Sequence, residues 1–258
     1  MKTFVKVSVL TAALTVTACA HVPLDPDARA EYDKVNDPAE PTNRAIFAGN
    51  RFIDRHVLKP VANAYVDYVP DRVRHSIHNF VSNLSEPAVL VNDLLQGNMS
   101  RAWTTTERFT INTTVGAAGL FDPAGGWGLP HHKADFGQTF GVWGIGPGPS
   151  VQLPLFSFSN VRDTAGRVVG IFADPLDYIL PDVTAASGGL DVVDTRADLM
   201  PTTDLLEKTS PDYYAALRSV MAQRRAALVE EGKSGGQDAE PPSAVPSAPT
   251  AAAEPRAE

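Results

Sequence analysis

Apolar residues recur at the spacing of an α-helix along much of the chain between Asn36 and Glu231. In DRVRHSIHNFVSNL the apolar positions are i, i+4, i+7, i+8 and i+11, counted from Val73, which gives a helix one apolar face. Alternation of apolar and polar residues, the pattern of a strand, is scarcely present outside Ser150 to Leu155. The pattern predicts a mainly α protein with a single helical domain.

Capping residues and helix breakers set the expected helix boundaries. Asp71 is suited to cap the helix expected over 71–84. Pro87 is suited to the first position of a second helix, and Gly97 is suited to end that helix in a left-handed conformation. Asp174-Pro175 is expected to stop a helix that Ser159 or Asn160 begins. Ser100 is expected to open a threonine-rich helix that weakens toward Gly116 and Gly119. A last helix is expected over 211–231, with Tyr214, Leu217, Met221 and Leu228 on one side.

One segment in the middle of the chain departs from this pattern. Residues 136–156 (FGQTFGVWGIGPGPSVQLPLF) contain five glycines, three prolines, four aromatic residues and no charge. The 53 residues from Phe109 to Val161 carry only three charges, at Asp122, Lys133 and Asp135, whereas the 20% charged composition of the chain would place about ten there. Such a stretch is either deeply buried or surrounded by something other than water.

The same segment predicts a short helix followed by a break. If residues 135–144 are helical, the aromatic residues share one face and a glycine stripe lies beside them: Phe136, Phe140 and Trp143, then Gly137, Gly141 and Gly144. Glycines at this spacing allow close backbone approach, as in helices packed within lipid, although ordinary cores use them too. GIGPGPS then breaks the helix. Irregular backbone at membrane depth is tolerated only inside protein or beside a wet cavity, so a cavity at the bilayer edge is one interpretation.

The N-terminal residues have the features of an export signal. Lys2 and Lys6 precede an apolar run from Val7 to Val16, which at ten residues is too short to span a bilayer. The following Val-Thr-Ala-Cys resembles the lipobox of bacterial lipoproteins, in which the cysteine becomes the acylated first residue. Cys19 is the only cysteine, so it forms no internal disulfide; an ordinary buried cysteine is the alternative. Ala20, rather than Asp, indicates the outer membrane by resemblance to lipoprotein sorting in Gram-negative bacteria.

The charge balance narrows the range of partners. Without residues 1–18 the chain keeps 20 basic and 30 acidic residues, because two of the 22 lysines and arginines are Lys2 and Lys6. A net charge of −10 argues against nucleic acid and against attraction to anionic lipid, so membrane contact must come from apolar surface. From Gly232 onward the chain is rich in Pro, Ala, Ser and Glu, and we expect a disordered tail.

Catalytic and metal-binding motifs give little support to an enzyme. The sequence has no G-x-S-x-G motif and no phosphate-binding glycine loop. His75 and His78 share a helical face, and His131 and His132 are adjacent, but the spacing supplies neither pair with a third zinc ligand. We therefore expect surface or capping histidines, no cofactor and no metal. The acidic run Glu31, Asp33, Asp37 and Glu40 is expected to be a solvated face.

Six segments, in order along the chain, resemble the MlaA (VacJ) family of outer-membrane lipoproteins. They are NDPAEPTNR (36–44), VLKPVANAY (57–65), VSNLSEPAVLVNDLLQG (81–97), RFTINTTVGAAGLFDPA (108–124), DFGQTFGVWGIGPGPSVQLPLF (135–156) and VRDTAG (161–166). With the lipobox they cover most of residues 19–180, whereas residues 183–231 match loosely and the tail does not match. Pro41-Thr42 and Gly49 depart from the family pattern.

The resemblance implies a doughnut-shaped helical protein in the inner leaflet of the outer membrane, built around an amphipathic channel. In the family such a protein removes misplaced phospholipids from the outer leaflet and passes them to a soluble periplasmic carrier, with porin trimers as membrane partners. The implied organisation is a lipoprotein signal peptide (1–18), an acylated N-terminus and linker (19–35), a lipid-transport domain (36–231) and a disordered tail (232–258).

Two sets of residues are candidates for the lipid path. Asn43, Arg44, Asn50 and Arg51 are candidates for a gate or leaflet contact, with structural hydrogen bonding as the alternative. The channel candidates are Phe136, Gly137, Phe140, Gly141, Val142, Trp143, Gly144, Ile145, Pro147 and Pro149. Two other classes of function stay open: a lipoprotein that scaffolds porins without moving lipid, and a periplasmic hydrolase.

Overall fold

The computed structural model describes residues 36–155 and 158–235, and most of these are helical. Cys19, the linker and the tail beyond Gly235 lie outside the described residues. In chain order the elements are α3 (Glu40–Ile53), the π-helix η1 (Asp54–Leu58), α4 (Lys59–Tyr68), α5 (Asp71–Leu95), α6 (Met99–Thr114), α7 (Pro123–Gly126), α8 (Phe136–Val142), β1 (Ser150–Gln152), β2 (Phe158–Asn160), α9 (Val161–Ala173), α10 (Pro175–Ile179), α11 (Pro181–Thr209) and α12 (Tyr213–Ser234).

Helix α5 is a single helix of 25 residues, so the prediction of two helices divided at Pro87 is wrong. A proline inside a helix removes one backbone hydrogen bond and normally kinks or ends the helix. Here α6 packs along α5 on both sides of the proline. Before it, Asn83 donates to Thr113 Oγ1 at 3.0 Å and Glu86 accepts from Arg108 at 3.1 Å; after it, Asp93 accepts from Thr105 at 2.7 Å. Tertiary contacts therefore hold α5 together across the proline.

Most of the predicted helix ends agree with the structure to within a few residues. Gly97 has φ +75°, as a left-handed C-cap requires. The Asn160 side chain accepts from Asp163 N and caps α9, which ends before Asp174-Pro175 as expected. Helix α6 is capped by Asn98 rather than opened by Ser100, because the Asn98 side chain accepts from Arg101 N. Helix α12 continues three residues past the expected end at Glu231.

The two short strands form an antiparallel hairpin in which Ser150 pairs with Asn160 and Gln152 with Phe158. The strand expected over Ser150 to Leu155 is thus limited to three residues, and its partner β2 was not predicted. Helix α3 packs against β1, and α12 packs against β2. The hairpin therefore joins the first and last described helices.

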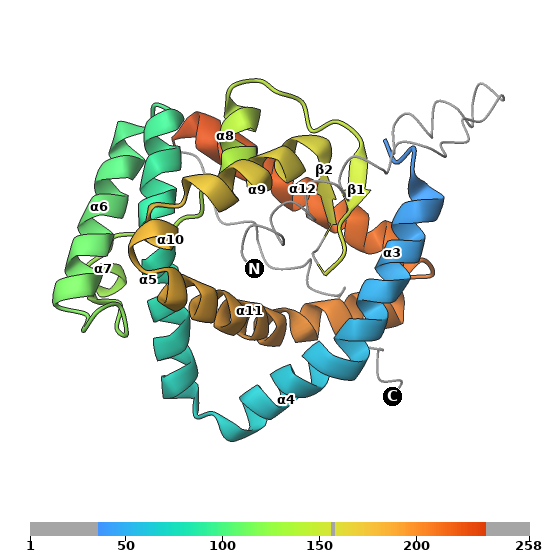
Figure 1. The fold of residues 1–258 in the computed structure, drawn as a ribbon, viewed down its shortest axis with the longest axis horizontal. Coiled ribbons are helices and arrows are strands. Elements are labelled where there is room, and N and C mark those ends of the chain that lie inside the picture. Colours follow the sequence, from blue (N-terminus) through green and yellow to red (C-terminus); the bar gives the residue numbers. More distant parts are fainter. Residues whose placement is uncertain (1–35, 156–157, 236–258) are drawn as a thin grey trace, which may run out of the picture.

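The elements follow one another around a closed circuit of contacts. Helix α11 packs against α4 and α5, α5 contacts α8, and α8 packs against α9 and α12. Helix α12 leads through the hairpin to α3, which continues through η1 into α4. In Figure 1 these elements occupy successive sectors of the outline, with α5 and α6 on the left, α8, α9 and α12 at the top, and α3 on the right. In the described residues no helix is both long enough and apolar enough to cross a bilayer.

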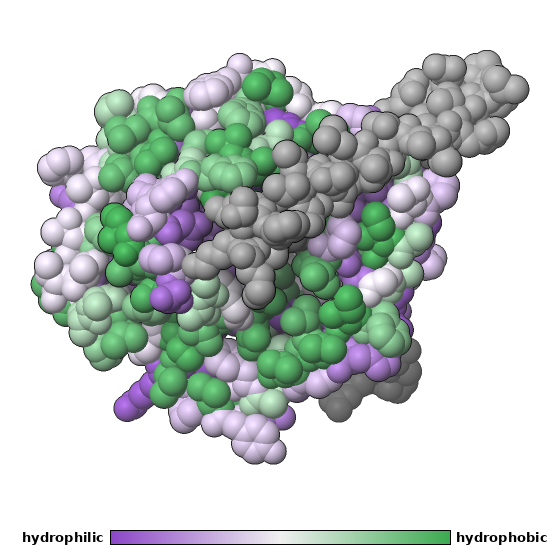
Figure 2. All heavy atoms as spheres, viewed as in Figure 1, coloured by the Kyte–Doolittle hydropathy of each residue, from purple (hydrophilic) through white to green (hydrophobic). Residues whose placement is uncertain are grey.

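The distribution of polarity between interior and surface is inverted relative to a typical globular protein. Among the described residues, 10 hydrophobic residues are buried, compared with 17 polar or charged ones. All three tryptophans of the chain, Trp103, Trp127 and Trp143, are more than half exposed. The space-filling view shows apolar residues gathered in broad areas of the surface (Figure 2). The buried apolar cluster is small and consists of Phe47, Phe158 and Tyr214, with Tyr213, Leu217 and Met221 packed against it.

Candidate functional site

Two glycines of the stripe in the central segment, Gly137 and Gly141, lie in contacts between helices, whereas a Cβ on the third, Gly144, would meet nothing within 4 Å. A Cβ built on Gly166 of α9 would lie 2.2 Å from Gly137 N and 2.5 Å from Gly137 Cα, so α8 and α9 touch backbone to backbone. A Cβ on Gly141 would meet Val229 and Arg162. Gly137 and Gly141, proposed for the channel wall, thus bring α8 close to α9 and α12. The close approach expected from their spacing is present, and it occurs within this chain.

Two ion pairs fix the beginning of α8 to neighbouring helices. Asp135 caps the helix by accepting from Gln138 N at 2.8 Å, and Arg225 of α12 donates to both of its oxygens. Burial alone would raise the pKa of Asp135, but the hydrogen bonds and charge of Arg225 hold it below its ordinary value. Arg225 also pairs with Asp163 of α9 at 2.8 Å. Asp135 therefore stays ionised near neutral pH, and Arg225 connects α8, α9 and α12 through its two carboxylate partners.

Phe136, the first residue of α8, is 9% exposed, and Phe140 and Val142 are partly buried, whereas the residues that follow α8 lie at the surface. Trp143 is 54% and Ile145 50% exposed, and Gly144, between them, has φ +89°. Pro147 and Pro149 are exposed as well, but their carbonyl oxygens each accept a backbone N–H from the start of α9 at 3.1 Å. This loop is thus anchored at its backbone and apolar at its surface.

Trp143 belongs to a larger exposed apolar area. Its Nε1 donates to the Leu95 carbonyl at 2.9 Å, which joins the end of α8 to the end of α5. The α5–α6 turn next to this contact presents Met99 and, one helical turn later, Trp103. We call these exposed residues, Leu94, Leu95, Met99, Trp103, Trp143 and Ile145, the tryptophan patch.

Asn43 and Asn50 connect α3 to the hairpin region through their side-chain amides. Asn43 is buried, accepts from Gln152 N at 3.0 Å, and donates to Asp37 and to the Ser150 carbonyl. Asn50, two helical turns later, donates to the Leu153 carbonyl and accepts from Leu155 N, each at 2.8 Å. Both amides act as backbone-like partners for the strand and the residues that follow it.

Arg44 and Arg51 line a pocket of about 580 Å³ where α3 meets the end of α11 and the beginning of α12. Arg44 pairs with Asp212 and lies 4.4 Å from the ring centre of Tyr214, while Arg51 pairs with Glu207 and lies 5.2 Å from that of Tyr213. The hydrogen bond from Arg44 lowers the pKa of Asp212 to about 2. Every candidate of the gate set thus has a structural partner, and its role as a gate stays a prediction.

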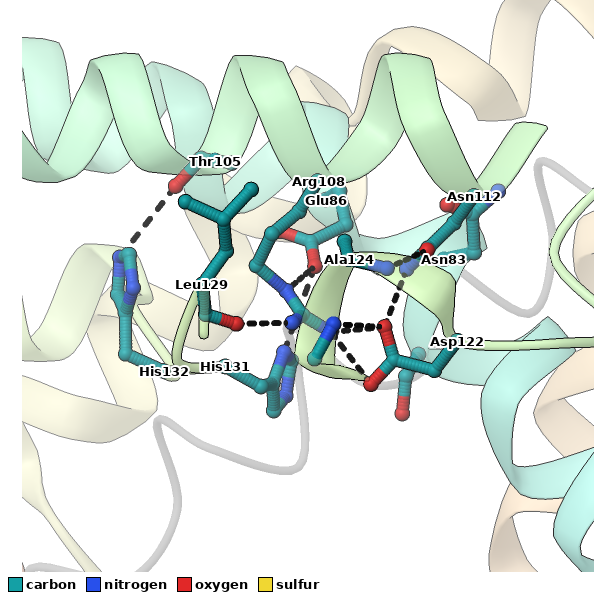
Figure 3. Close-up of polar contacts among 12 residues, drawn as sticks. Asn83, Glu86, Thr105, Arg108, Asn112, Asp122, Ala124, Leu129, His131 and His132 are labelled. Carbon is teal, nitrogen blue, oxygen red and sulfur yellow. Dashed lines mark hydrogen bonds and ion pairs between the residues drawn. The ribbon is translucent and has the colours of Figure 1, made fainter. Parts of the chain in front are cut away.

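Arg108 occupies the centre of a polar interior between α5 and α6 (Figure 3). The guanidinium donates to Glu86 at 3.1 Å, to the Leu129 carbonyl at 2.6 Å and to both oxygens of Asp122 at 3.2 Å. Asn112 holds the other side of Asp122, and its own oxygen accepts from Ala124 N. This network fixes the loop after α6 onto the helix pair.

A second cluster in the same interior contains His132 and Asp93. His132 Nε2 lies 2.9 and 3.0 Å from the two oxygens of Asp93, which also accepts from Thr105 at 2.7 Å. The expectation of a surface or capping histidine is therefore wrong for His132, whose side chain is 10% exposed. The expectation of a solvated acidic run is wrong for Asp37, which is 1% exposed and accepts from Tyr214 and Arg218.

Sequence reasoning missed the polar interior, although α6 carries a signal for it. Arg101, Thr105, Arg108 and Asn112 recur at intervals of four, three and four residues, and all four are buried. This is the period that ordinarily marks an apolar helix face. A polar face of this kind opposite exposed Met99 and Trp103 indicates a helix whose outer side contacts something other than water.

Comparison with known proteins agrees with the expected family. The model of the MlaA lipoprotein family matches residues 35–228. The Escherichia coli protein named intermembrane phospholipid transport system lipoprotein MlaA is 34% identical over 202 residues, covering 77% of this chain and 80% of that protein. The Haemophilus influenzae protein of the same name is 29% identical, over 90% of this chain and 93% of the relative.

A solved structure gives the same result at the level of the fold. It comes from work described as "Structural basis for maintenance of bacterial outer membrane lipid asymmetry", and it superposes with a TM-score of 0.68 at 36% identity. The alignment covers 75% of this chain and 98% of that chain. The family model matches most of this chain, and the Escherichia coli relative is 34% identical over 77% of it. The chain therefore belongs to the MlaA lipoprotein family.

Proposed function

We propose that this protein is an outer-membrane lipoprotein, acylated at Cys19 on the periplasmic side, that removes misplaced phospholipids from the outer leaflet and passes them to a soluble periplasmic carrier. Membership of a family whose relatives are named for intermembrane phospholipid transport supports the transport of phospholipid. Porin trimers and the carrier are proposed as partners, and lipid passes without chemical change. The observation that carries the proposal is the inverted distribution of polarity described above.

Exposed apolar side chains favour contact with lipid over contact with water. Each Å² of apolar surface removed from water contributes about 25 cal/mol, so an exposed patch of this kind marks a surface with an apolar partner. Tryptophan is the side chain best suited to the edge of a bilayer, because its ring is apolar and its N–H seeks a polar partner. Trp143 has both features, since its ring is exposed and its N–H is bonded to Leu95. The tryptophan patch is our candidate for the membrane-facing surface.

We infer that the lipid path runs inside the circuit of elements, as the doughnut-shaped fold expected for the family requires. A phospholipid needs a polar lane for its headgroup and an apolar opening for its tails. The exposed channel candidates, Trp143, Ile145, Pro147 and Pro149, are suited to the opening, while Gly137 and Gly141 support it by holding α8 against α9 and α12. The segment with Asn43, Arg44, Asn50 and Arg51 is proposed as the leaflet contact.

The test of transport is a deletion strain labelled with a reagent that reacts only with phospholipid at the cell surface. Deletion is expected to raise the labelling, and expression of the protein from a plasmid is expected to restore it. Labelling at the wild-type level in the deletion strain would contradict the proposal.

A pair of substitutions at Ile145 separates a conduit from a scaffold. Ile145 is half exposed, so polar replacements should fold, whereas the partly buried Val142 lies against α12 and is less suitable. Ile145→Asp places a charge in the proposed path and is expected to leave surface labelling as high as in the deletion strain. Ile145→Asn introduces a side chain of the same shape as aspartate without its charge, and it is expected to restore transport at least in part. If the protein only buttresses porins, the two variants should lower surface labelling to the same degree. Lipid turnover by the purified protein would instead indicate a hydrolase.

A further inference from the structure

Three side chains able to bind a metal ion meet where α5 packs against α11, outside the residues assigned to the lipid path. They are His78 of α5 and Asp194 and Asp198 of α11. One ligand atom from each lies within 4.8 Å of the other two. The two aspartates are one helical turn apart, so both face α5. His78 and Asp194 are 116 positions apart in the sequence, which is why residue spacing alone gave the histidines no third ligand.

Asp194 is held in place by a hydrogen bond from Tyr65 of α4. The residue is 6% exposed; one carboxylate oxygen accepts from the Tyr65 hydroxyl at 3.0 Å, and the other lies 2.8 Å from His78 Nδ1. Metal-binding carboxylates are commonly oriented by an outer hydrogen bond of this kind.

The charge around the cluster leaves room for a cation. Arg74, one turn before His78 on α5, is a positive group near the cluster, and the charge of Asp198 is the smallest cause of the raised pKa of its guanidinium. The strongest cause of the raised pKa is its hydrogen bond to Asp71, with which Arg74 forms an ion pair. Arg74 is thus already engaged by Asp71, which leaves the two carboxylates of the cluster available to a cation.

We propose that His78, Asp194 and Asp198 bind a divalent transition-metal ion, Zn²⁺ being the best match, with water in the fourth position. One imidazole and two carboxylates suit Zn²⁺, whereas Mg²⁺ takes oxygen ligands. Tetrahedral bonds of about 2.0–2.1 Å put ligand atoms roughly 3.4 Å apart, so the exposed side chains of His78 and Asp198 need to move by about 1 Å. The bound ion would connect α5 to α11 and stiffen this part of the circuit.

Isothermal titration of the purified, metal-stripped full chain, without a histidine tag, tests the site. ZnCl₂ is expected to bind at one ion per chain, MgCl₂ is expected to give no saturable binding, and excess Zn²⁺ should raise the Tm by roughly 5 °C. His78→Ala and Asp198→Asn each remove one exposed ligand and are expected to weaken Zn²⁺ binding at least tenfold. Co²⁺ is expected to give the visible absorption of a tetrahedral site, and the same two variants should lose it.

His75→Ala is the matched control, because His75 is an exposed histidine on the same helix and is not part of the cluster. It is expected to bind Zn²⁺ like the unmodified chain. The proposal is overturned if the unmodified chain shows no saturable site, if His78→Ala and Asp198→Asn bind as tightly as that chain, or if His75→Ala weakens binding equally. None of these outcomes depends on lipid transport.

Discussion

The contact between Gly166 and Gly137 allows a sharp test of how α8 is held. Gly166→Ala adds a Cβ that would lie 2.2 Å from Gly137 N, 2.5 Å from Gly137 Cα and 2.8 Å from the Phe136 carbonyl carbon. All three atoms belong to the backbone, so no rotation of a side chain relieves the overlap. Because ordinary contacts begin at 3.4 Å, α8 must retreat by roughly 1 Å.

The expected cost follows from two opposing contributions. Overpacking a tight contact costs about 1–3 kcal/mol, and a clash against backbone belongs at or above the upper end of that range. Alanine is the better helix former by about 1 kcal/mol, which offsets part of the cost. We expect Gly166→Ala to lower the free energy of unfolding by about 2 kcal/mol. Gly188→Ala in α11 is the matched control, because its Cβ would meet nothing within 4 Å, and it should gain up to about 1 kcal/mol.

Urea unfolding of the purified protein in detergent, followed by circular dichroism, measures both variants. A lower midpoint at an unchanged m-value is expected for Gly166→Ala, and a slightly higher midpoint for Gly188→Ala. If Gly166→Ala unfolds at the midpoint of the unmodified chain, or if the two variants shift it in the same direction, the close approach of α8 and α9 is not what holds this segment.

Two further predictions concern charged side chains. Arg108→Met leaves Glu86 and Asp122 without their cation and is expected to lower the free energy of unfolding by about 3–5 kcal/mol in the same urea assay. The control Arg72→Met, at an exposed position, should change it by less than about 0.5 kcal/mol. A similarly small effect of Arg108→Met would contradict the role of the network. The pKa of Asp212 is lowered to about 2 by Arg44, so ionised Asp212 adds stability above its ordinary pKa of 3.8, and that stability is lost as pH falls toward 2. An NMR titration should show Arg44→Gln returning this pKa toward 3.8, and an unchanged value would refute the assigned cause.

Local signals predicted individual elements well where only neighbouring residues decide the outcome. Gly97 ends a helix because glycine adopts positive φ without strain, and Asn160 caps α9 because its side chain reaches a free N–H two to three residues ahead. Pro87 shows the limit of such rules. Its neighbours Asn83 and Glu86 are bonded to α6, and these contacts outweigh the proline's tendency to end the helix.

The role of the uncharged segment in a lipid path stays a prediction, and the structure decides only where the residues of the segment lie. The uncharged segment does lead into the exposed tryptophan patch, yet Gly137 and Gly141 in the same segment face other helices of the chain. Spacing within α8 could not distinguish these cases, because lipid and a neighbouring helix favour the same small residues. Asn43 and Asn50 likewise have backbone partners that lie more than 100 positions away.

By itself, the sequence determined the helical class, the family, most helix ends and the unusual lack of charge around residues 109–161. Only the tertiary structure decided that polar residues fill the interior while the tryptophans face outward, and that His78 meets Asp194 and Asp198. The physical reason is the distance along the sequence over which each kind of interaction acts. Backbone preferences and caps act over a few residues, whereas burial and ion pairing depend on which distant segments the fold brings together.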